Sequence, residues 1–511
     1  MLNSAVDINH ELNRLLRFAL SRGLIEPLDV PWAANGLTGE LGLTDFFLEP
    51  SLKERPEENF EAIPTPDPIL ERVLDWAVEA GLTPDTAADR DLLDTRLMGA
   101  LTPRPSWTAA RFEALRADSP EAATNWFYDL GVASNYIRKA RVDRNLCWKA
   151  ATEYGELDIT INLSKPEKDP REIARARAAA PSSYPKCLLC RENEGFYGNA
   201  SHPARQNLRL IPMDLRGRRW YFQYSPYGYY NEHCIVLSEG HVPMRISRET
   251  FENLAAFLDI LPHYFAGSNA DLPIVGGSIL SHDHYQGGRY VFPMERAPVE
   301  REYRIPGCGT VSVGRVKWPM SALRLASEDA EALIALSCHI LEAWRGYTDA
   351  SVGVLNESGG EPHNTITPIA RRRGPLYEFD LVLRNNRTSP EHPLGVFHPH
   401  AEVHHIKKEN IGLIEVMGLA VLPPRLKGAL ASMAEAWERG EDDLSGQPNL
   451  AAHDPWYRSL RQRHRGLPSG AVEGMLRAEV GRVFEQVLHD SGVFKRDAKG
   501  AEAFDRFAAG L

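Results

Sequence analysis

Residues 275 to 288 read Val-Gly-Gly-Ser-Ile-Leu-Ser-His-Asp-His-Tyr-Gln-Gly-Gly, a strand-like approach that leads into a His-x-His-x-Gln cluster. Residues spaced i, i+2 on an extended segment project to the same face, so His282, His284 and Gln286 are expected to line one pocket. Asp283 and Tyr285 then point to the other face. The pattern predicts a strand that presents three converging polar side chains.

The residue types in this cluster indicate phosphate chemistry. Glycine pairs flank the histidines, and a glycine lets backbone N–H groups approach a phosphate closely because it has no Cβ atom. A neutral imidazole can attack phosphorus and then leave, which splits one displacement into two through a covalent intermediate. The amide of Gln286 can donate a hydrogen bond to a phosphoryl oxygen, but it cannot take a proton from water as a third histidine could. The site is therefore interpreted as one for group transfer rather than hydrolysis.

An isolated His-x-His pair is more often two ordinary strand histidines with solvent or core partners. The flanking glycine pairs and Gln286 favour the functional interpretation here.

The segment from Gly276 to Gly288 resembles the active-site segment of the class II galactose-1-phosphate uridylyltransferases, a bacterial branch of the histidine-triad superfamily. Residues 398 to 418, His-Pro-His-Ala-Glu-Val-His-His-Ile-Lys-Lys-Glu-Asn-Ile-Gly-Leu-Ile-Glu-Val-Met-Gly, resemble the second long signature of that class. Three shorter segments also fit the class: Ala34-Asn-Gly-Leu, Tyr184-Pro-Lys-Cys-Leu-Leu-Cys and Leu383-Arg-Asn-Asn-Arg-Thr. Together they are spread over most of the chain.

The resemblance implies a ping-pong exchange of the Leloir pathway of galactose metabolism. UDP-glucose gives its uridylyl group to a histidine, glucose-1-phosphate leaves, galactose-1-phosphate enters, and UDP-galactose forms. The second histidine of the His-x-His pair is the nucleophile in that family, so the role falls on His284, and Gln286 holds the phosphoryl group. The residues expected to wrap the nucleotide phosphates are Gly276, Gly277, Ser278, Ser281 and Gly287.

Sugar phosphates are anions, and planar guanidinium groups hold phosphate oxygens in pairs. The second half of the chain offers such arginines, of which Arg371, Arg384 and Arg387 are the candidates for substrate binding. Most arginines in such a run face solvent, so only one or two contacts to substrate are expected. The tyrosine-rich stretch from Tyr221 to Tyr230 could stack on uracil, although core packing is the more common use of such residues.

Cys187 and Cys190 have the two-residue spacing that lets paired thiolates chelate one tetrahedral zinc ion. One pair is only half a site, and two reduced cysteines in a turn are the alternative. In class I enzymes a structural zinc takes two cysteines, one histidine after a strand and the first histidine of the His-x-His pair. Carried over to this chain, the resemblance implies zinc ligands Cys187, Cys190, His241 and His282.

A second metal, iron or zinc, is implied more loosely by the same relatives. Its ligands would be His363, His398 and His400 with a carboxylate from Glu295 or, as we prefer, Glu300. A hydrogen-bonded histidine cluster without metal is the alternative for these residues. No organic cofactor is expected.

Composition bounds the remaining possibilities. A chain of 511 residues with 43% hydrophobic and 25% charged content can bury a large core and exceeds one ordinary domain. The net charge of −11 argues against a nucleic-acid or membrane-surface partner. We expect a cytoplasmic protein, since no apolar run reaches the roughly 20 residues of a membrane span and no signal segment stands at the N-terminus. The six cysteines do not suggest a disulfide framework, and a homodimer is left open.

The fold class expected is α+β: two fused histidine-triad-like halves with antiparallel sheets, plus N-terminal and C-terminal helical additions. The predicted regions are a helical region over 1–150, a first half with the nucleophile over 151–320, a second half over 321–425 and a helical region over 426–511. Helical periodicity predicts helices over 8–22, 68–80, 89–101, 247–265, 327–347, 424–439 and 470–489. Strands are predicted over 157–163 and 378–383, and a hairpin over 219–237 that turns at Ser225-Pro-Tyr-Gly.

Two rival functions stay in view. A dinucleoside polyphosphate phosphorylase or hydrolase of the same superfamily would share the histidine nucleophile, although a hydrolase more often carries a third histidine where Gln286 stands. A non-catalytic zinc-dependent nucleotide-binding protein would also use the cysteines and glycines, but its binding would survive the loss of His284.

Overall fold

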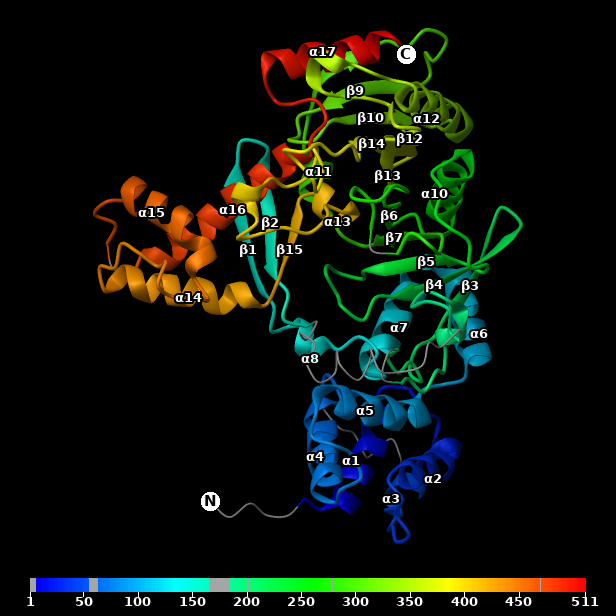
Figure 1. Cartoon of the computed structure of the whole chain (residues 1–511). Helices are drawn as coiled ribbons and strands as arrows, with labels where there is room; N and C mark the ends of the chain where they lie inside the picture. Colours follow the sequence, from blue (N-terminus) through cyan, green and yellow to red (C-terminus); the bar gives the residue numbers. More distant parts are fainter. Residues whose placement is uncertain (1–5, 55–62, 165–183, 200–201, 278, 469) are drawn as a thin grey trace. The chain divides into compact units, whose positions relative to one another are not determined.

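The computed structural model describes residues 6–54, 63–164, 184–199, 202–277, 279–468 and 470–511. Within these ranges the chain forms two compact units (Figure 1). The first unit holds residues up to 144 and from 164 to 242, and the second holds residues 145–163 and 243–511. Helices and largely antiparallel sheets occur together, which confirms the predicted α+β class. No described helix is long and apolar enough to cross a membrane.

The first unit begins with helices whose buried faces follow from the sequence. In α1, Asp7 caps the N-terminus by accepting a hydrogen bond from the backbone N–H of His10, and Leu12, Leu15 and Leu16 lie on the buried face. The α-helices in the described part of this unit are α1 (Ile8–Ser21), α2 (Val30–Glu40), α3 (Ser51–Glu54), α4 (Asp67–Glu79), α5 (Ala87–Leu101), α6 (Pro105–Asp118), α7 (Pro120–Ala133) and α8 (Lys139–Val142).

Three antiparallel strands complete the first unit: β3 (Ile211–Leu215), β4 (Arg218–Tyr224) and β5 (Cys234–Ser238). β4 and β5 are the two arms of the predicted hairpin. The rings of Phe222 and Tyr224 on β4 pack against Phe127 of α7, with ring centroids 5.6 and 5.3 Å apart. The tyrosine-rich stretch therefore supplies core packing in these positions, as the commoner use of such residues suggested.

The second unit contains one large sheet. Its strands lie in the order β7 (His284–Gly288), β6 (Phe265–Gly267), β13 (Asn364–Arg373), β14 (Leu376–Asn385), β10 (Ala322–Ser327), β9 (Ser312–Val316) and β8 (Val299–Tyr303). Helices α10 (Arg248–Ile260) and α12 (Ala330–Arg345) pack against β13. Two short helices lie in loops between strands: α11 (Pro293–Arg296) between β7 and β8, and α13 (Leu413–Val416) after β14. β11 (Glu357–Ser358) and β12 (Glu361–Pro362) form a small hairpin.

A separate three-stranded sheet of the second unit pairs β1 (Leu146–Thr152) with β2 (Gly155–Ile161), and β2 with β15 (Leu419–Leu422). The β15–β2 pairing is parallel, so this sheet is mixed rather than antiparallel throughout. The phenolic hydroxyl of Tyr290, two residues after β7, donates a hydrogen bond to Asp158 of β2 at 2.7 Å. This bond connects the end of the strand that carries His284 and Gln286 to the smaller sheet.

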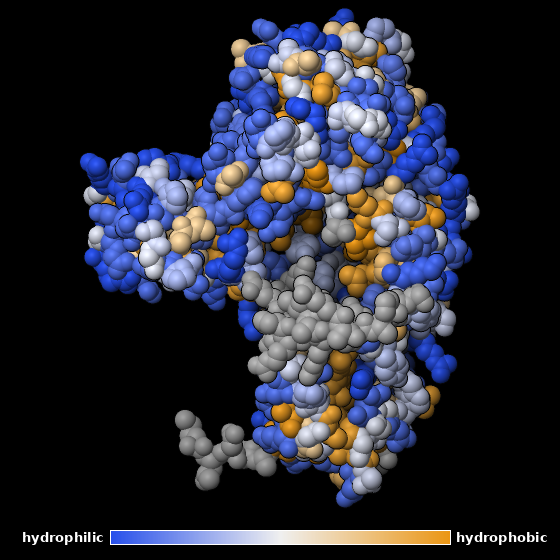
Figure 2. Space-filling model, viewed as in Figure 1, coloured by the Kyte–Doolittle hydropathy of each residue, from blue (hydrophilic) through white to orange (hydrophobic). Residues whose placement is uncertain are grey.

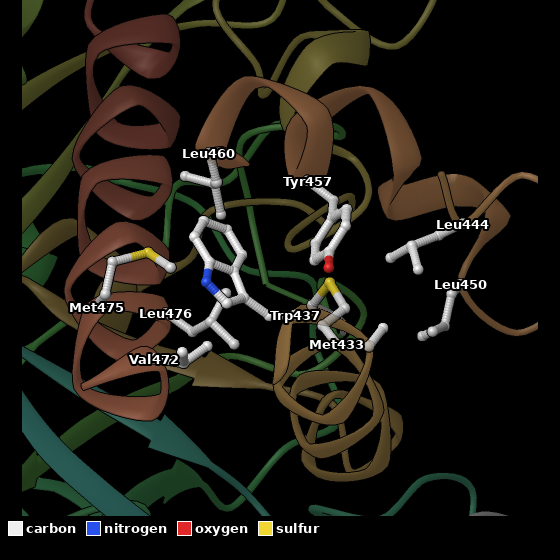
Figure 3. Close-up of a cluster of buried hydrophobic side chains, with 10 residues drawn as sticks. Met433, Trp437, Leu444, Leu450, Tyr457, Leu460, Val472, Met475 and Leu476 are labelled. Carbon is white, nitrogen blue, oxygen red and sulfur yellow. The ribbon is translucent and has the colours of Figure 1, made fainter. Parts of the chain in front are cut away.

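The C-terminal helices have a hydrophobic cluster of their own. α14 (Arg425–Glu438), α15 (Asp454–Arg463) and α16 (Val472–Ser491) enclose it, and α17 (Ala498–Ala509) follows them. In Figure 3 the indole of Trp437 lies between Leu460 and Leu476, which come from the other two helices. The visible outer surface of α14 and α15 is mostly hydrophilic in Figure 2, as expected for helices that bury one face.

Two histidines beside this cluster make stability depend on pH. His405 and His453 lie with ring centroids 5.5 Å apart, and burial lowers the pKa of each to about 4. Arg425 adds a positive charge that also disfavours protonation of both rings. At a pH between 4 and 6.5 the folded state therefore binds fewer protons than the unfolded state, whose histidines have pKa values near 6.5. The contribution of the two neutral histidines to stability is complete above pH 6.5 and is lost as the pH falls toward 4.

We expect the thermal midpoint to decrease as the pH is lowered from 7.5 to about 5.5. Each of the two histidines should lower the free energy of unfolding by an amount on the order of 1 kcal/mol. Differential scanning calorimetry across this range checks it. Replacing His453 by phenylalanine should flatten the pH dependence, whereas His339→Gln, at an exposed position, should leave it unchanged. A pH profile identical in all three proteins would contradict the assignment.

Candidate active site

The His-x-His-x-Gln segment enters the large sheet as strand β7. β7 pairs with β6 in antiparallel register, with Gly267 opposite Gln286 and Phe265 opposite Gly288. Tyr285 is buried, and its hydroxyl accepts a hydrogen bond from the side-chain amide of Asn253 on α10 at 3.1 Å. Because side chains alternate along a strand, His284 and Gln286 lie on the face opposite α10. The predicted alternation is confirmed for His284, Tyr285 and Gln286. The expected strand begins later than predicted, because β7 starts at His284 and the chain bends at His282 before it.

His284 is held in one tautomer by the backbone. Its ring nitrogen Nδ1 lies 2.8 Å from the carbonyl oxygen of His282, so Nδ1–H donates to that carbonyl and Nε2 keeps its lone pair. Only 6% of the residue is exposed, and burial lowers the pKa of His284 to about 4. No side-chain pattern in the sequence identifies this acceptor. The fold supplies one by bending the chain at His282, just before β7 begins.

The glycines before the histidines pack closely against the chain. A side chain added at Gly276 would lie 2.5 Å from the carbonyl oxygen of Ala270, and one at Gly277 would lie 2.5 Å from the amide nitrogen of Asn269. The Oδ1 atom of Asn269 accepts a hydrogen bond from the N–H of Leu413, at the start of α13. Because neither glycine has a side chain, the segment before the histidines packs directly against Ala270 and Asn269. Asn269 is in turn bonded to Leu413, which belongs to the second signature segment.

The other predicted binding residues of this segment have mixed positions. Ser281 is exposed, and Gly287 lies within β7, opposite Ala266. Ser278 lies outside the described residues.

The three candidate arginines all have protein partners. Arg371 donates from Nε to Glu378 at 2.7 Å and from a terminal nitrogen to Asp380 at 2.6 Å. Arg384 donates to the carbonyl oxygen of Ile411 at 2.9 Å, and burial lowers its pKa to about 10. Arg387 donates to the carbonyl oxygen of Gly353 at 3.1 Å. Substrate binding by these arginines stays a prediction.

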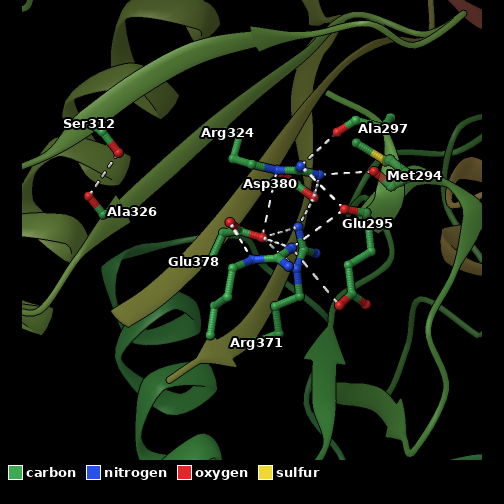
Figure 4. Close-up of polar contacts among 10 residues, drawn as sticks. Met294, Glu295, Ala297, Ser312, Arg324, Ala326, Arg371, Glu378 and Asp380 are labelled. Atoms are coloured by element: carbon green, nitrogen blue, oxygen red, sulfur yellow. Dashed lines mark hydrogen bonds and ion pairs between the residues drawn. The ribbon is translucent and has the colours of Figure 1, made fainter. Parts of the chain in front are cut away.

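Arg371 belongs to a buried network of charges that the sequence analysis missed. Arg324 of β10 lies opposite Asp380 of β14 and donates to its two carboxylate oxygens at 2.7 and 3.0 Å (Figure 4). Arg324 also donates to the carbonyl oxygens of Met294 and Ala297 at 2.9 Å each. The spacing of Glu378 and Asp380, i and i+2 on a strand, could have indicated two carboxylates on one face.

Three of the predicted zinc ligands meet within the first unit. The sulfur atoms of Cys187 and Cys190 lie 3.6 Å apart, and the Cys190 sulfur lies 3.3 Å from Nδ1 of His241. The first distance is far longer than the roughly 2 Å of a disulfide bond. A tetrahedral zinc ion with bonds of about 2.3 Å to sulfur and about 2.0 Å to nitrogen holds such pairs about 3.8 and 3.5 Å apart. The donor set therefore fits zinc.

The four candidate ligands of a second metal are engaged separately. His363 contacts Ser358 and Asn386 at 2.6 and 2.8 Å, and His398 contacts Asn410 at 3.2 Å. His400 contacts the carbonyl oxygen of Val396 at 3.1 Å. Glu300 forms a two-fold ion pair with Arg496 at 2.8 and 2.7 Å. Among the described residues, the groups of clustered metal-ligand atoms do not include these four, and their joint site stays a prediction.

Comparison with known proteins covers nearly the whole chain. The family model described as the N-terminal domain of galactose-1-phosphate uridyl transferase matches residues 37–243, and the model of its C-terminal domain matches residues 257–452. The galactose-1-phosphate uridylyltransferase of Clostridium acetobutylicum is 56% identical over 98% of this chain and 99% of its own. The enzymes of that name from Caldanaerobacter subterraneus and Bacillus subtilis are 53% and 48% identical, each over 98% of this chain and 97% of its own.

Among solved structures, a yeast Ap4A phosphorylase aligns with 61% of this chain and 85% of its own at 14% identity, with a TM-score of 0.30.

Proposed function

We propose that this chain, which belongs to the galactose-1-phosphate uridylyltransferase family, performs its nucleotidyl transfer through His284 as the nucleophile. The observation that carries the proposal is the bond from Nδ1 of His284 to the carbonyl oxygen of His282. It directs the lone pair of the imidazole to Nε2, the atom that must attack phosphorus. Burial keeps the ring neutral at physiological pH, so the lone pair is available without prior loss of a proton.

The reaction would proceed in two displacements. Nε2 of His284 attacks the α-phosphorus of UDP-glucose, an N–P bond forms, and the P–O bond to glucose-1-phosphate breaks. The Nδ1 proton stays on the ring, where the His282 carbonyl stabilises the positive charge of the uridylyl-imidazolium. A phosphate oxygen of galactose-1-phosphate then attacks the same phosphorus, UDP-galactose forms, and the imidazole returns to its neutral form.

Gln286 follows His284 on the same face of β7, and we assign its amide to a non-bridging phosphoryl oxygen. An amide donates a hydrogen bond to this oxygen in both displacements but takes no proton from water. This difference separates a transferase from a hydrolase, in which a base would activate water. The backbone of residues 276 to 281 is the proposed cradle of the nucleotide phosphates.

The test is intact-protein mass spectrometry of the enzyme mixed with UDP-glucose and no acceptor. We expect an acid-labile adduct of the mass of a uridylyl group in the natural protein and none in His284→Ala. Galactose-1-phosphate should then remove the adduct and yield UDP-galactose. Release of UMP without an adduct would favour the hydrolase alternative, and binding without turnover would favour a nucleotide-binding protein.

We further propose a structural zinc ion bound by Cys187, Cys190 and His241, with His282 as the fourth ligand that the sequence implies. Zinc there would support the loop that precedes β7, since a rigid outer support orients a catalytic side chain. Cys190→Ser is expected to lower the bound zinc, measured by atomic emission, from about one ion per chain to well below one. The thermal midpoint should fall with it. Cys147→Ser, at an exposed cysteine, is the matched control. Equal zinc in both variants would refute this ligand set.

We assign the enzyme to the cytoplasm. No disulfide bond joins any of the six cysteines, all of which lie in the described ranges, as suits a reducing compartment, and UDP-sugars are the substrates that the family name implies.

A further inference from the structure

A second group of metal-ligand side chains lies in the second unit, apart from every residue assigned above. Glu153 stands in the turn between β1 and β2, while Glu485 and His489 stand on α16. One ligand atom from each of the three lies within 4.8 Å of the others. Glu485 and His489 are four residues apart, so they project from the same face of the helix one turn apart. This spacing lets both side chains reach one ion.

The elements that carry these residues are held firmly together. α16 crosses β1 so closely that a side chain added at Gly481 would overlap Ala150. The ring of Tyr154, next to Glu153 in the turn, packs edge-on against the imidazole of His489 with centroids 5.4 Å apart. The three ligands therefore come from a helix and a tight turn whose relative position is fixed by packing, as a metal site requires.

The group places two carboxylates beside one imidazole. The carboxylate of Glu485 lies close to Glu153, whose charge repels it and whose backbone N–H donates a hydrogen bond to it. Arg482 attracts Glu485 electrostatically, but the ion pair of Arg482 is formed with Glu479, at 2.5 Å.

The neighbouring cations are committed elsewhere. Arg496 forms the two-fold ion pair with Glu300, and Lys495 donates to the carbonyl oxygens of His489 and Asp490 at 3.0 and 2.8 Å. A bound divalent cation would offset the repulsion between the two glutamates without competing with these contacts.

We propose that Glu153, Glu485 and His489 bind one divalent first-row transition ion, of the kind that accepts mixed carboxylate and imidazole ligands, such as Mn²⁺. Two carboxylate oxygens and one imidazole nitrogen suit this class better than the thiolate-rich group of the first unit does. Glu153 is exposed, so water can complete the coordination sphere. The ion would clamp the β1–β2 turn to the C-terminal half of α16.

The experiment is an electron paramagnetic resonance titration of the full-length protein with MnCl₂, in which loss of the free-ion signal counts bound Mn²⁺. The variants are Glu485→Gln and His489→Gln. Glu473→Gln is the matched control, because it makes the same change at an exposed position of the same helix. We expect one Mn²⁺ per chain in the natural protein and the control, and a Kd at least about 10-fold weaker in both variants, since even outer partners of metal ligands are worth 10-fold to 100-fold.

Thermal unfolding separates lost binding from lost folding. Without Mn²⁺, Glu485→Gln should unfold at or above the temperature of the natural protein, because it removes a repulsion between like charges. With Mn²⁺, the midpoint should rise for the natural protein and the control but not for either variant. Mn²⁺ binding of equal strength in all four proteins, or no binding to the natural protein at millimolar Mn²⁺, would overturn the proposal. Neither result bears on the role of His284.

Discussion

His284→Ala is expected to lower kcat for uridylyl transfer by a factor on the order of 10⁴ to 10⁶, the usual cost of removing a catalytic nucleophile. The substitution removes the only atom that can carry the covalent intermediate in the proposed scheme, while the binding site for the nucleotide keeps its other groups. The KM for UDP-glucose should therefore change far less than kcat. A coupled assay that follows glucose-1-phosphate release, run with each substrate varied in turn, measures both constants.

His339→Ala is the control for this measurement, because His339 is an exposed histidine on α12 whose ring nitrogen Nε2 hydrogen-bonds the carbonyl oxygen of Leu511. Its kcat should equal that of the natural protein. The half-reaction must also fail in His284→Ala: no glucose-1-phosphate should appear from UDP-glucose alone, even in stoichiometric amount. A variant that retains a substantial fraction of its kcat would show that another residue carries the uridylyl group.

The local sequence around His284 predicted most of what matters for this chemistry. The i, i+2 spacing placed His284 and Gln286 on one face and Tyr285 on the other, as β7 confirms. The acceptor for the Nδ1 proton could not be predicted from the sequence. It depends on the bend at His282, which turns that residue's own carbonyl toward the ring two positions ahead. A backbone direction of this kind has no signature in side-chain spacing.

Long helices with strong periodicity were also predicted well. The predictions over 8–22 and 68–80 correspond to α1 and α4, and those over 424–439 and 470–489 correspond to α14 and α16. The predicted helix over 247–265 ends earlier, because α10 stops at Ile260 and the chain has entered strand β6 at Phe265. Buried apolar residues at the end of a helix and in a short strand look alike in sequence.

Strand β13 was missed for a physical reason. Pro368 stands near its middle, and a proline usually argues against a central strand because it has no N–H to donate. The carbonyl oxygen of Pro368 accepts from the N–H of Ser268, so the proline faces β6, whose pairing with β13 starts one residue later at Ile369. An N–H at position 368 would face the chain beyond the last paired residue of β6. The proline therefore costs no backbone hydrogen bond between the paired residues of β13 and β6.

The charged residues of β13 and β14 have partners that the sequence analysis did not predict. The sequence showed the arginines as available cations, because the register of β13 against β14, which brings Arg371 beside Glu378 and Asp380, is not evident from residue types alone. The structure pairs Arg371 with Glu378 and Asp380 across the β13–β14 hairpin and adds Arg324 from β10. Arg324 and Arg371 therefore pair with Asp380 inside the sheet, and a contact of Arg371 with substrate would be additional to this pairing.

Asp380→Asn is accordingly expected to destabilise the protein by about 3 to 5 kcal/mol, the typical cost of breaking a buried ion pair from one side. Asp380 is fully buried; burial alone would raise the pKa of its carboxyl, but Arg371 and Arg324 hold it below the usual value. The asparagine leaves these two buried guanidinium groups to share Glu378. Urea unfolding at neutral pH, followed by tryptophan fluorescence, measures the shift of the midpoint.

Asp442→Asn is the matched control, because the Asp442 carboxylate is 78% exposed and pairs with Arg461 at the surface, where an ion pair contributes little. Glu378→Gln provides a milder second variant that should fold even if Asp380→Asn does not. Both network variants should leave the KM for galactose-1-phosphate unchanged when assayed in folded protein. An unchanged urea midpoint together with a selectively raised KM would instead assign Arg371 and its carboxylates to the substrate, because a group that holds the sheet together cannot be removed without loss of stability.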